Sequence, residues 1–270
     1  MGTTRRNFLR NISLGSAIAL CPELLFSREI TDNDIPLFDY HVHLEQDLTI
    51  ENAVANFRQK NMKFGVVEHP GPRYSAMVND GLLLEYIRKY EPYDVLIGLQ
   101  PVDPGWYKQF SPETLGKLYY ILMDAMEIPD GKGGYERLWH PQYKLENEST
   151  FMDRYLNFYV EVLENEKIDI LANPTFLPTI LAPDYDKLWT EKRMDTVIRY
   201  AIKNQVALEI NSRYQYPKAS FIKMAKDAGA KFTFGSNAHN QQQVQNYDYC
   251  LQMVKECGLT KHDLYTIDEK

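Results

Sequence analysis

The chain has 270 residues and is 44% hydrophobic, which suffices for one sizeable core and does not require a second domain. Its formal net charge is −7, and no block of lysine and arginine interrupts the sequence. This balance argues against nucleic acid as a partner.

The first 30 residues have the composition of an export signal. The pair Arg5-Arg6 precedes Asn7-Phe8-Leu9-Arg10, which is a twin-arginine pattern, and an apolar stretch follows at 12–20. Nine apolar residues are too few to cross a bilayer, which takes about 20. We therefore expect residues 1–30 to be a twin-arginine-like signal, with an exported protein, periplasmic or extracellular, and no membrane span; the alternative is a disordered basic tail.

The three cysteines do not predict a disulfide-stabilised fold. Cys21 follows the apolar stretch, where a lipid anchor could attach, but the preceding residue is leucine at a position that favours small residues. Cys250 and Cys257 lie on one predicted helix, where seven residues span about 10 Å, which is beyond disulfide reach.

Residues 31–270 are predicted to form one domain after a polar linker at 31–36. Short β-rich runs are expected at 37–44, 63–68, 94–100, 119–125, 169–173, 206–211 and 231–235. Helical periodicity is expected at 50–59, 81–90, 152–166, 191–204, 219–228 and 243–256. Thr49, Ser111 and Ser149 are suited to cap helices. This alternation predicts a parallel sheet covered by helices.

Polar residues follow the C-terminal end of every predicted strand. They are His41, His43, Glu68, His69, Gln100, Asp103, Asp124, Glu127, Asn173, Glu209, Asn211, Asn237 and His239. In an open doubly wound sheet, only strands near the switch point would carry such residues. We therefore predict an α/β fold, a (β/α)7 TIM-like barrel with its site at the C-terminal mouth.

Alternate residues of a strand share a face, so His41 and His43 point to one spot and Asn237 and His239 to another. If the first and last strands close the barrel, these pairs meet and could share a metal ion. Asp39 is on the face of His41 and is expected to accept a hydrogen bond from an imidazole there. His140 and His262 are expected to lie outside the site, His140 at its rim and His262 in solvent.

Four motifs in order resemble the polymerase and histidinol phosphatase (PHP) family. They are Asp39-Tyr40-His41-Val42-His43, Gly65-Val66-Val67-Glu68-His69-Pro70, Leu208-Glu209-Ile210-Asn211-Ser212 and Phe234-Gly235-Ser236-Asn237-Ala238-His239. The resemblance implies a distorted seven-stranded barrel, up to three divalent metals and phosphoesterase activity. It places His41, His43, His69 and His239 at metal-binding positions.

Other positions depart from the family. Gln100 stands in place of Glu, Asn237 in place of Asp, and Met126 and Asn173 in place of His. Neutral amide oxygens bind hard divalent ions less strongly than carboxylates do. The resemblance therefore implies a reduced site with one or two ions, zinc or manganese, to which Glu127 could contribute. A zinc-bound water with a pKa of about 7 would suffice for hydrolysis.

The resulting hypothesis is an exported metal-dependent hydrolase that acts on a small molecule, most plausibly a phosphate ester. Its expected metal ligands are His41, His43, His69, His239, Asn237 and Glu127. Its expected catalytic residues are His69, Glu68 and Glu209, and its expected substrate-binding residues are Arg73, Arg213, Asn211, Gln100 and Asn173. Loops near the mouth also carry Tyr74, Trp106, Tyr107, Tyr135, Trp139, Tyr214 and Tyr216, whose rings could contact substrate.

Two alternatives stay open. One is a catalytically degenerate barrel that binds a small polar or sugar-like ligand, and the other is a hydrolase of a non-phosphate bond such as an amide or lactone. The sequence leaves the oligomeric state open.

Overall fold

The computed structural model describes residues 35–45, 47–145 and 147–267. The predicted signal at 1–30 and Cys21 lie outside the described residues. From Pro36 onward the chain forms one compact unit. No helix in the described part is long and apolar enough to cross a bilayer.

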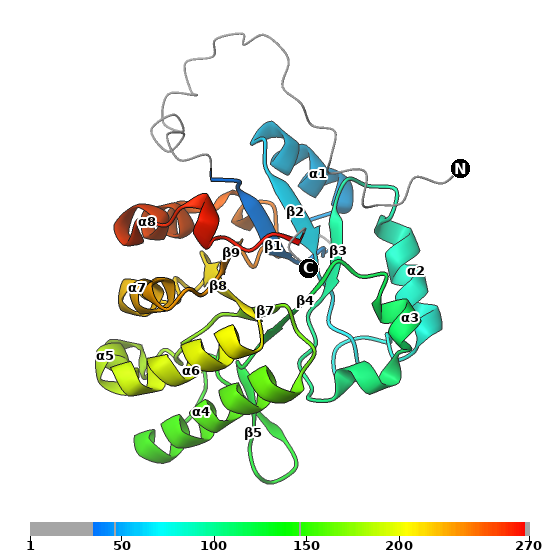
Figure 1. Cartoon of the computed structure of the whole chain (residues 1–270). Helices are drawn as coiled ribbons and strands as arrows, with labels where there is room; N and C mark the ends of the chain where they lie inside the picture. The colour runs from blue at the N-terminus through cyan, green and yellow to red at the C-terminus, as the bar shows by residue number, and fades with distance from the viewer. Residues whose placement is uncertain (1–34, 46, 146, 268–270) are drawn as a thin grey trace. The chain divides into compact units, whose positions relative to one another are not determined.

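Seven parallel strands close into a barrel (Figure 1). In barrel order they are β1 (Phe38–Val42), β2 (Lys63–Val66), β3 (Leu96–Leu99), β4 (Tyr120–Asp124), β7 (Ile170–Ala172), β8 (Ala207–Asn211) and β9 (Phe232–Gly235). The barrel closes where Asp39 of β1 pairs with Phe234 of β9, and Val42 bridges Ala238 just beyond. The predicted (β/α)7 TIM-like barrel is therefore confirmed.

Helices lie outside the strands (Figure 1). They are α1 (Ile50–Gln59), α2 (Asp80–Tyr90), α3 (Pro112–Leu115), α4 (Glu148–Asn165), α5 (Tyr185–Leu188), α6 (Glu191–Lys203), α7 (Ala219–Asp227) and α8 (Asp248–Cys257). Short 3-10 turns occupy Trp106–Gln109, Ala182–Asp184, Gln243–Gln245 and Lys261–Asp263.

The predicted caps hold for two helices. The Thr49 side chain accepts from Asn52 N at α1, and that of Ser111 accepts from Thr114 N at α3. The prediction of Ser149 as a cap was wrong, because the Asn147 side chain already caps α4 two residues earlier. The last helix also begins later than predicted, since a separate 3-10 turn occupies Gln243–Gln245.

A hairpin that the sequence analysis did not predict follows β4. Its antiparallel strands are β5 (Glu127–Pro129) and β6 (Tyr135–Arg137). Arg154 of α4 holds β6 through both carboxylate oxygens of Glu136, at 2.6 and 2.8 Å. The hairpin thus replaces the direct β4-to-helix connection of a regular barrel.

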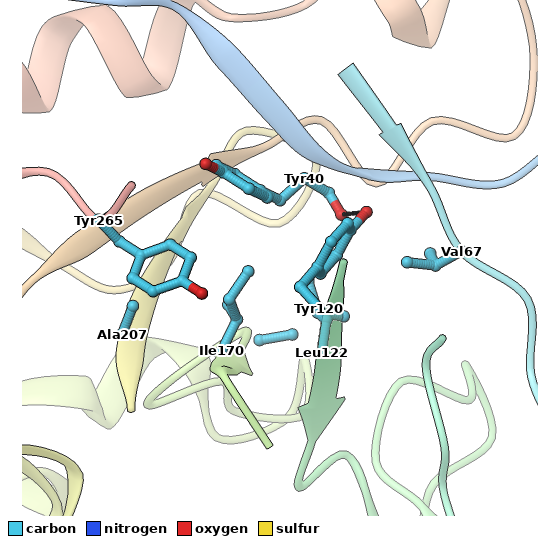
Figure 2. Close-up of a cluster of buried hydrophobic side chains, with 8 residues drawn as sticks. Tyr40, Val67, Tyr120, Leu122, Ile170, Ala207 and Tyr265 are labelled. Atoms are coloured by element: carbon cyan, nitrogen blue, oxygen red, sulfur yellow. Dashed lines mark hydrogen bonds between the residues drawn. The ribbon is translucent and has the colours of Figure 1, made fainter. Parts of the chain in front are cut away.

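Tyr120 fills the N-terminal end of the barrel (Figure 2). A Cβ atom at Gly65 would lie 2.3 Å from the Tyr120 hydroxyl oxygen, and one at Gly98 would lie 2.6 Å from its Cζ. Glycine in β2 and β3 therefore makes room for this ring, whose hydroxyl donates to the Tyr40 carbonyl at 2.6 Å. The packed cluster comprises Tyr40, Val67, Tyr120, Leu122, Ile170, Ala172, Ala207 and Tyr265.

The apolar cluster leaves the opposite, C-terminal end of the barrel for polar side chains.

Both described cysteines, Cys250 and Cys257, are free and buried, in agreement with the prediction that they do not pair.

Candidate functional site

A pocket of about 170 Å³ opens at the C-terminal end of the barrel. Histidines, aromatic rings and a few charged side chains line it. The lining residues are His43, His69, Tyr74, Gln100, Val102, Asp124, Met126, Glu127, Trp139, Arg213, Tyr214, Asn237 and His239.

Four imidazoles from the two ends of the chain meet at this pocket. The His43 ring stacks on His239 with centroids 4.4 Å apart and on His69 at 4.9 Å, and His41 lies 5.2 Å away. The backbone fixes this contact, because His43 N donates to Ala238 O at 2.8 Å where β1 meets β9. The structure therefore brings together the four histidines that the sequence placed at one site. Their metal-binding role stays a prediction.

His41 lies beneath the pocket in a chain of hydrogen bonds. Its Nδ1 lies 2.7 Å from Glu209 Oε1, and its Nε2 lies 3.0 Å from Gln100 Oε1. Gln100 in turn donates through Nε2 to Asp124 Oδ2 at 3.0 Å. Both partners of the ring are acceptor oxygens, so both ring nitrogens donate and the imidazole is charged.

The electrostatics agree with a charged His41. Burial opposes the charged form, but the charge of Glu209 and the hydrogen bond to it outweigh burial, so the pKa of His41 is raised. For Asp124, burial raises the pKa, and it outweighs the hydrogen bond from Met126 N, which lowers the pKa.

Glu209 of β8 is fully buried, and its carboxylate pairs with His41 Nδ1. Its Oε2 accepts from Asn173 N at 2.8 Å and from Asn211 Nδ2 at 3.1 Å. Asn211 also accepts from Tyr214 N at 3.1 Å. Neither Glu209 nor Asn211 is among the described residues that line the pocket. Their polar atoms are engaged with each other and with the strand ends, and the expected catalytic role of Glu209 and substrate contact of Asn211 stay predictions.

Asn173 is also absent from the described pocket lining, and its expected role in binding substrate stays a prediction. The residue adopts a positive φ of 47° and uses its backbone N–H to bind Glu209. Its side chain is 1% exposed, and neither amide atom has a hydrogen-bond partner among the described residues.

Asp39 does not bind an imidazole, contrary to expectation. Its Oδ1 accepts from the backbone N–H groups of His41 and Ser236, at 2.9 and 3.1 Å. Its Oδ2 accepts from the hydroxyls of Ser236 and Tyr247. Burial nevertheless raises the pKa of Asp39. The carboxylate thus ties β1 to the end of β9, and Glu209 has the role expected of Asp39.

His43 and His69 present bases to the pocket. Burial, followed by the neighbouring imidazoles, lowers the pKa of His43 well below its usual value, so its ring is neutral. His69 Nδ1 lies 2.8 Å from the Gln100 carbonyl oxygen, which can only accept. In the neutral form of His69, Nδ1 therefore carries the proton and Nε2 has a free lone pair.

Two predicted site residues are engaged in ion pairs beside the pocket. Glu127 Oε2 accepts from Arg73 Nη1 at 2.9 Å, and Oε1 lies 3.4 Å from Arg137 Nε. Arg73 also pairs with Asp103 at 2.6 Å and lies 3.9 Å over the Tyr135 ring. Both side chains are thus paired with protein groups, and the expected roles of Glu127 as a metal ligand and of Arg73 in contacting substrate stay predictions.

Glu68 does not join the pocket either. Its Oε1 accepts from the His69 backbone N–H at 2.9 Å, and it is not among the described lining residues. The carboxylate thus fixes the backbone of His69, and the expected catalytic role of Glu68 stays a prediction. His140 and His262 are exposed and outside the pocket.

Arg213 is the cation of the pocket. The side chain is exposed, donates to the Asn237 carbonyl at 3.2 Å and lies 5.4 Å from the centre of the Tyr214 ring. No Asp or Glu within the described residues forms an ion pair with it. Its guanidinium is therefore available to an anion, and its expected contact with substrate stays a prediction.

Several expected donors of the predicted divalent ion are hydrogen-bonded to other side chains. His41 has both nitrogens engaged, and His239 has Nδ1 2.5 Å from Glu45 and Nε2 3.1 Å from Asn237 Oδ1. Only His43 and His69 keep an uncommitted imidazole nitrogen. Among the described residues, no three His, Cys, Asp or Glu side chains form a metal-binding group. The expected one or two divalent ions stay a prediction.

Sequence reasoning assigned no role to Asp124, which lines the pocket floor and orients Gln100. Its place at the end of β4 was the available signal. Gln100 was expected to contact substrate; it does line the pocket, but its side chain is held between His41 and Asp124.

No protein-family model and no curated protein matches the sequence. Distant similarities to solved structures exist. A chain of an archaeal ribonuclease P with mature tRNA is 15% identical, with 83% of each chain covered and a TM-score of 0.44. Dihydroorotase from Saccharomyces cerevisiae, in complex with 5-fluoroorotic acid, is 13% identical, with 87% of this chain and 83% of that chain covered and a TM-score of 0.43. The citrate synthase SbnG is 10% identical, with 82% and 94% covered and a TM-score of 0.38. None of these carries an argument about function.

Proposed function

We propose that the protein is a hydrolase of a small anionic ester, with a phosphate ester as the leading substrate class. The observation that carries this proposal is the meeting of neutral imidazoles and an unpaired arginine in one pocket at the C-terminal mouth. This end of a β/α barrel is where such enzymes hold their active sites. The finer hypothesis, an exported PHP-type phosphoesterase with one or two divalent ions, is part of the same proposal and rests on the four sequence motifs.

The pocket supplies two of the groups that ester hydrolysis needs. Arg213 would bind the substrate anion and offset the charge that develops during attack. His69 Nε2 would accept the proton of the attacking water, because the Gln100 carbonyl fixes the proton on Nδ1. His41, which lies below the pocket, stays protonated, and its positive charge contributes to lowering the pKa of His43.

The test is turnover by the purified protein on a panel of phosphomonoesters, phosphodiesters, carboxylic esters and lactones. We expect His69→Ala to lower kcat/KM on any accepted substrate by at least about 100-fold, since a positioned base contributes about 10²–10⁴-fold. His262→Ala is the matched control, because that imidazole is exposed and outside the pocket. Equal activity of the two variants would reject His69 as the base.

Metal content is measured on the same preparation, with turnover recorded before and after a chelator. Bound zinc or manganese that is lost in His43→Ala, together with turnover that the chelator abolishes, would support the metal-dependent form. Turnover that persists after the metal has been removed would support histidine acid–base chemistry alone.

A ligand-binding barrel without turnover is the second candidate. The observation that favours it is the His41–Gln100–Asp124 chain of hydrogen bonds. The resemblance implies metal ligands at His41 and Gln100, but His41 is hydrogen-bonded through both nitrogens and Gln100 is a neutral amide. No turnover on the whole panel, with a ligand that raises the Tm, would support this candidate.

A further inference from the structure

We infer that the pocket takes a small aryl anion, with its anionic group at Arg213 and its aromatic ring against Trp139 and Tyr74. This inference rests on the proposed function in placing the anion at Arg213, and it adds the class of group that the anion carries.

The two ends of the pocket differ in chemistry. Arg213 and Tyr214 follow β8, and Asn237 and His239 follow β9, so this side is cationic and polar. Tyr74 follows β2, and Met126 and Trp139 lie between β4 and α4. In barrel order, β7 lies between β4 and β8, and β1 lies between β9 and β2, so the two groups occupy different sides of the mouth.

The aromatic side suits a flat apolar ring. Trp139 is 40% exposed, and the Tyr74 ring already lies against His69 with centroids 5.1 Å apart. The Tyr74 hydroxyl is buried and has no hydrogen-bond partner among the described residues. A buried polar group without a partner is costly, so an ester or acid oxygen of a ligand would stabilise it.

Charge on this side is already neutralised. Two carboxylates, Glu127 and Asp124, line the pocket after β4 within the described residues. Arg73 and Arg137 pair with Glu127, and Asp124 accepts from Gln100 Nε2 and Met126 N. Few acceptors are left there for the several hydroxyls of a sugar, which would be desolvated without partners. An aryl ring therefore fits this wall better than a sugar ring.

The size of the pocket limits the ligand further. A volume of about 170 Å³ corresponds to roughly six water molecules at ~30 Å³ each. This is room for a single ring with one anionic group and excludes a polymer from being enclosed.

Binding is measured by calorimetry with phenylphosphonate, ethylphosphonate, inorganic phosphate and glucose 1-phosphate. The phosphonates have a carbon–phosphorus bond in place of the ester, so binding is measured without hydrolysis. We expect phenylphosphonate to bind about fivefold more tightly than ethylphosphonate, from stacking of rings. It should also quench tryptophan fluorescence through Trp139, because Trp106 and Trp189 are 2% and 0% exposed.

Two variants separate the two ends. Trp139→Ala should erase the preference for the phenyl group and leave inorganic phosphate binding unchanged, whereas Ile180→Ala, an exposed apolar control outside the pocket, should retain the preference. Arg213→Gln should weaken both phosphonates by about tenfold or more. Arg199→Gln, whose arginine is exposed on α6, should not weaken them.

Equal affinities for the two phosphonates, or an unchanged preference in Trp139→Ala, would overturn the inference while leaving hydrolysis of other anions possible. Tighter binding of glucose 1-phosphate than of phenylphosphonate would overturn the aryl assignment. A phenyl preference in a protein that hydrolyses none of the panel substrates would support the inference and reject the proposed hydrolase.

Discussion

Gly235→Ala tests the buried arrangement on which the site depends. Gly235 ends β9 with no space beside it: a Cβ atom there would lie 1.9 Å from Glu209 Oε1, 2.7 Å from its Cδ and 2.9 Å from His41 Cβ. Contacts below 3.0 Å are essentially never seen for Cβ atoms, so the carboxylate would have to retreat by about 1 Å.

That displacement disturbs the hydrogen bonds of Glu209. His41 Nδ1, Asn173 N and Asn211 Nδ2 lie at 2.7, 2.8 and 3.1 Å from its two oxygens, so a shift of about 1 Å does not keep all three bonds in good geometry. Breaking a buried ion pair costs about 3–5 kcal/mol. We expect Gly235→Ala to lower the free energy of unfolding by that amount.

The assay is urea unfolding followed by circular dichroism, with linear extrapolation to water. Gly81→Ala is the control, because this glycine is exposed in the first turn of α2, where alanine raises helix propensity by up to about 1 kcal/mol. A Cβ atom there would lie 3.2 Å from Asn79 Oδ1, which requires a shift of only a few tenths of an ångström, so we expect a change in stability of at most about 1 kcal/mol. Glu209→Ala removes the two closest atoms and leaves the 2.9 Å contact with His41 Cβ, so adding Gly235→Ala to Glu209→Ala should cost far less than Gly235→Ala alone. A loss below about 1 kcal/mol in Gly235→Ala, or additive losses in the double variant, would refute the reasoning.

Three further predictions follow from the same contacts. Because the pKa of His41 is raised in the folded state, its pairing with Glu209 stabilises the protein fully below the pKa of the unfolded state, about 6.5, and this stabilisation declines as the pH rises through the folded-state pKa. Glu209→Gln should flatten that decline in the free energy of unfolding between pH 5 and 9. Parallel curves for the variant and the wild type would contradict this prediction. Tyr120→Phe removes the 2.6 Å bond to the Tyr40 carbonyl and should lower the free energy of unfolding by about 1 kcal/mol in urea, whereas no loss would show that ring packing alone suffices. Asn237→Asp should increase the bound divalent metal found by elemental analysis, because a carboxylate binds hard ions more strongly than an amide does, and unchanged metal content would exclude this position from the predicted ligand set.

The barrel could be predicted because its signals are local and repeated. Each strand of the barrel is a short apolar run that ends in polar residues, and Tyr120–Asp124 falls within the predicted range 119–125. The β5–β6 hairpin could not be predicted, since strands of three residues are too short to show a period. Nor does a strand pattern indicate that Tyr120 would require glycine in β2 and β3.

The meeting of the histidines could also be predicted, but their partners could not. Alternation along a regular strand places Asp39 on the face of His41, which made it the expected acceptor. The pairing of β1 with β2 shifts register between Asp39 and Val42, and the carboxylate turns to Ser236 and Tyr247 instead. The partner of His41 is Glu209, 168 residues away, which only the closed barrel brings near.

Gln100 shows why single substitutions in the motifs were hard to interpret. Its amide accepts from His41 through the oxygen and donates to Asp124 through the nitrogen at the same time, which a carboxylate cannot do. Gln100→Glu would place two carboxylates about 3 Å apart with no proton between them, so it should lower the free energy of unfolding at pH 7 by about 2 kcal/mol.

The loss in Gln100→Glu should shrink as the pH falls and one of the two carboxylates gains a proton, which urea unfolding at pH 7 and pH 4.5 would measure. Wild-type stability at pH 7 together with newly bound divalent metal would contradict this account. In that case the side chain at position 100 would bind a metal ion better than it binds the His41 N–H group, and Gln100 would be a metal ligand that this chain has lost. Loss of stability without metal would instead show that Gln100 is matched to Asp124 and to a charged His41.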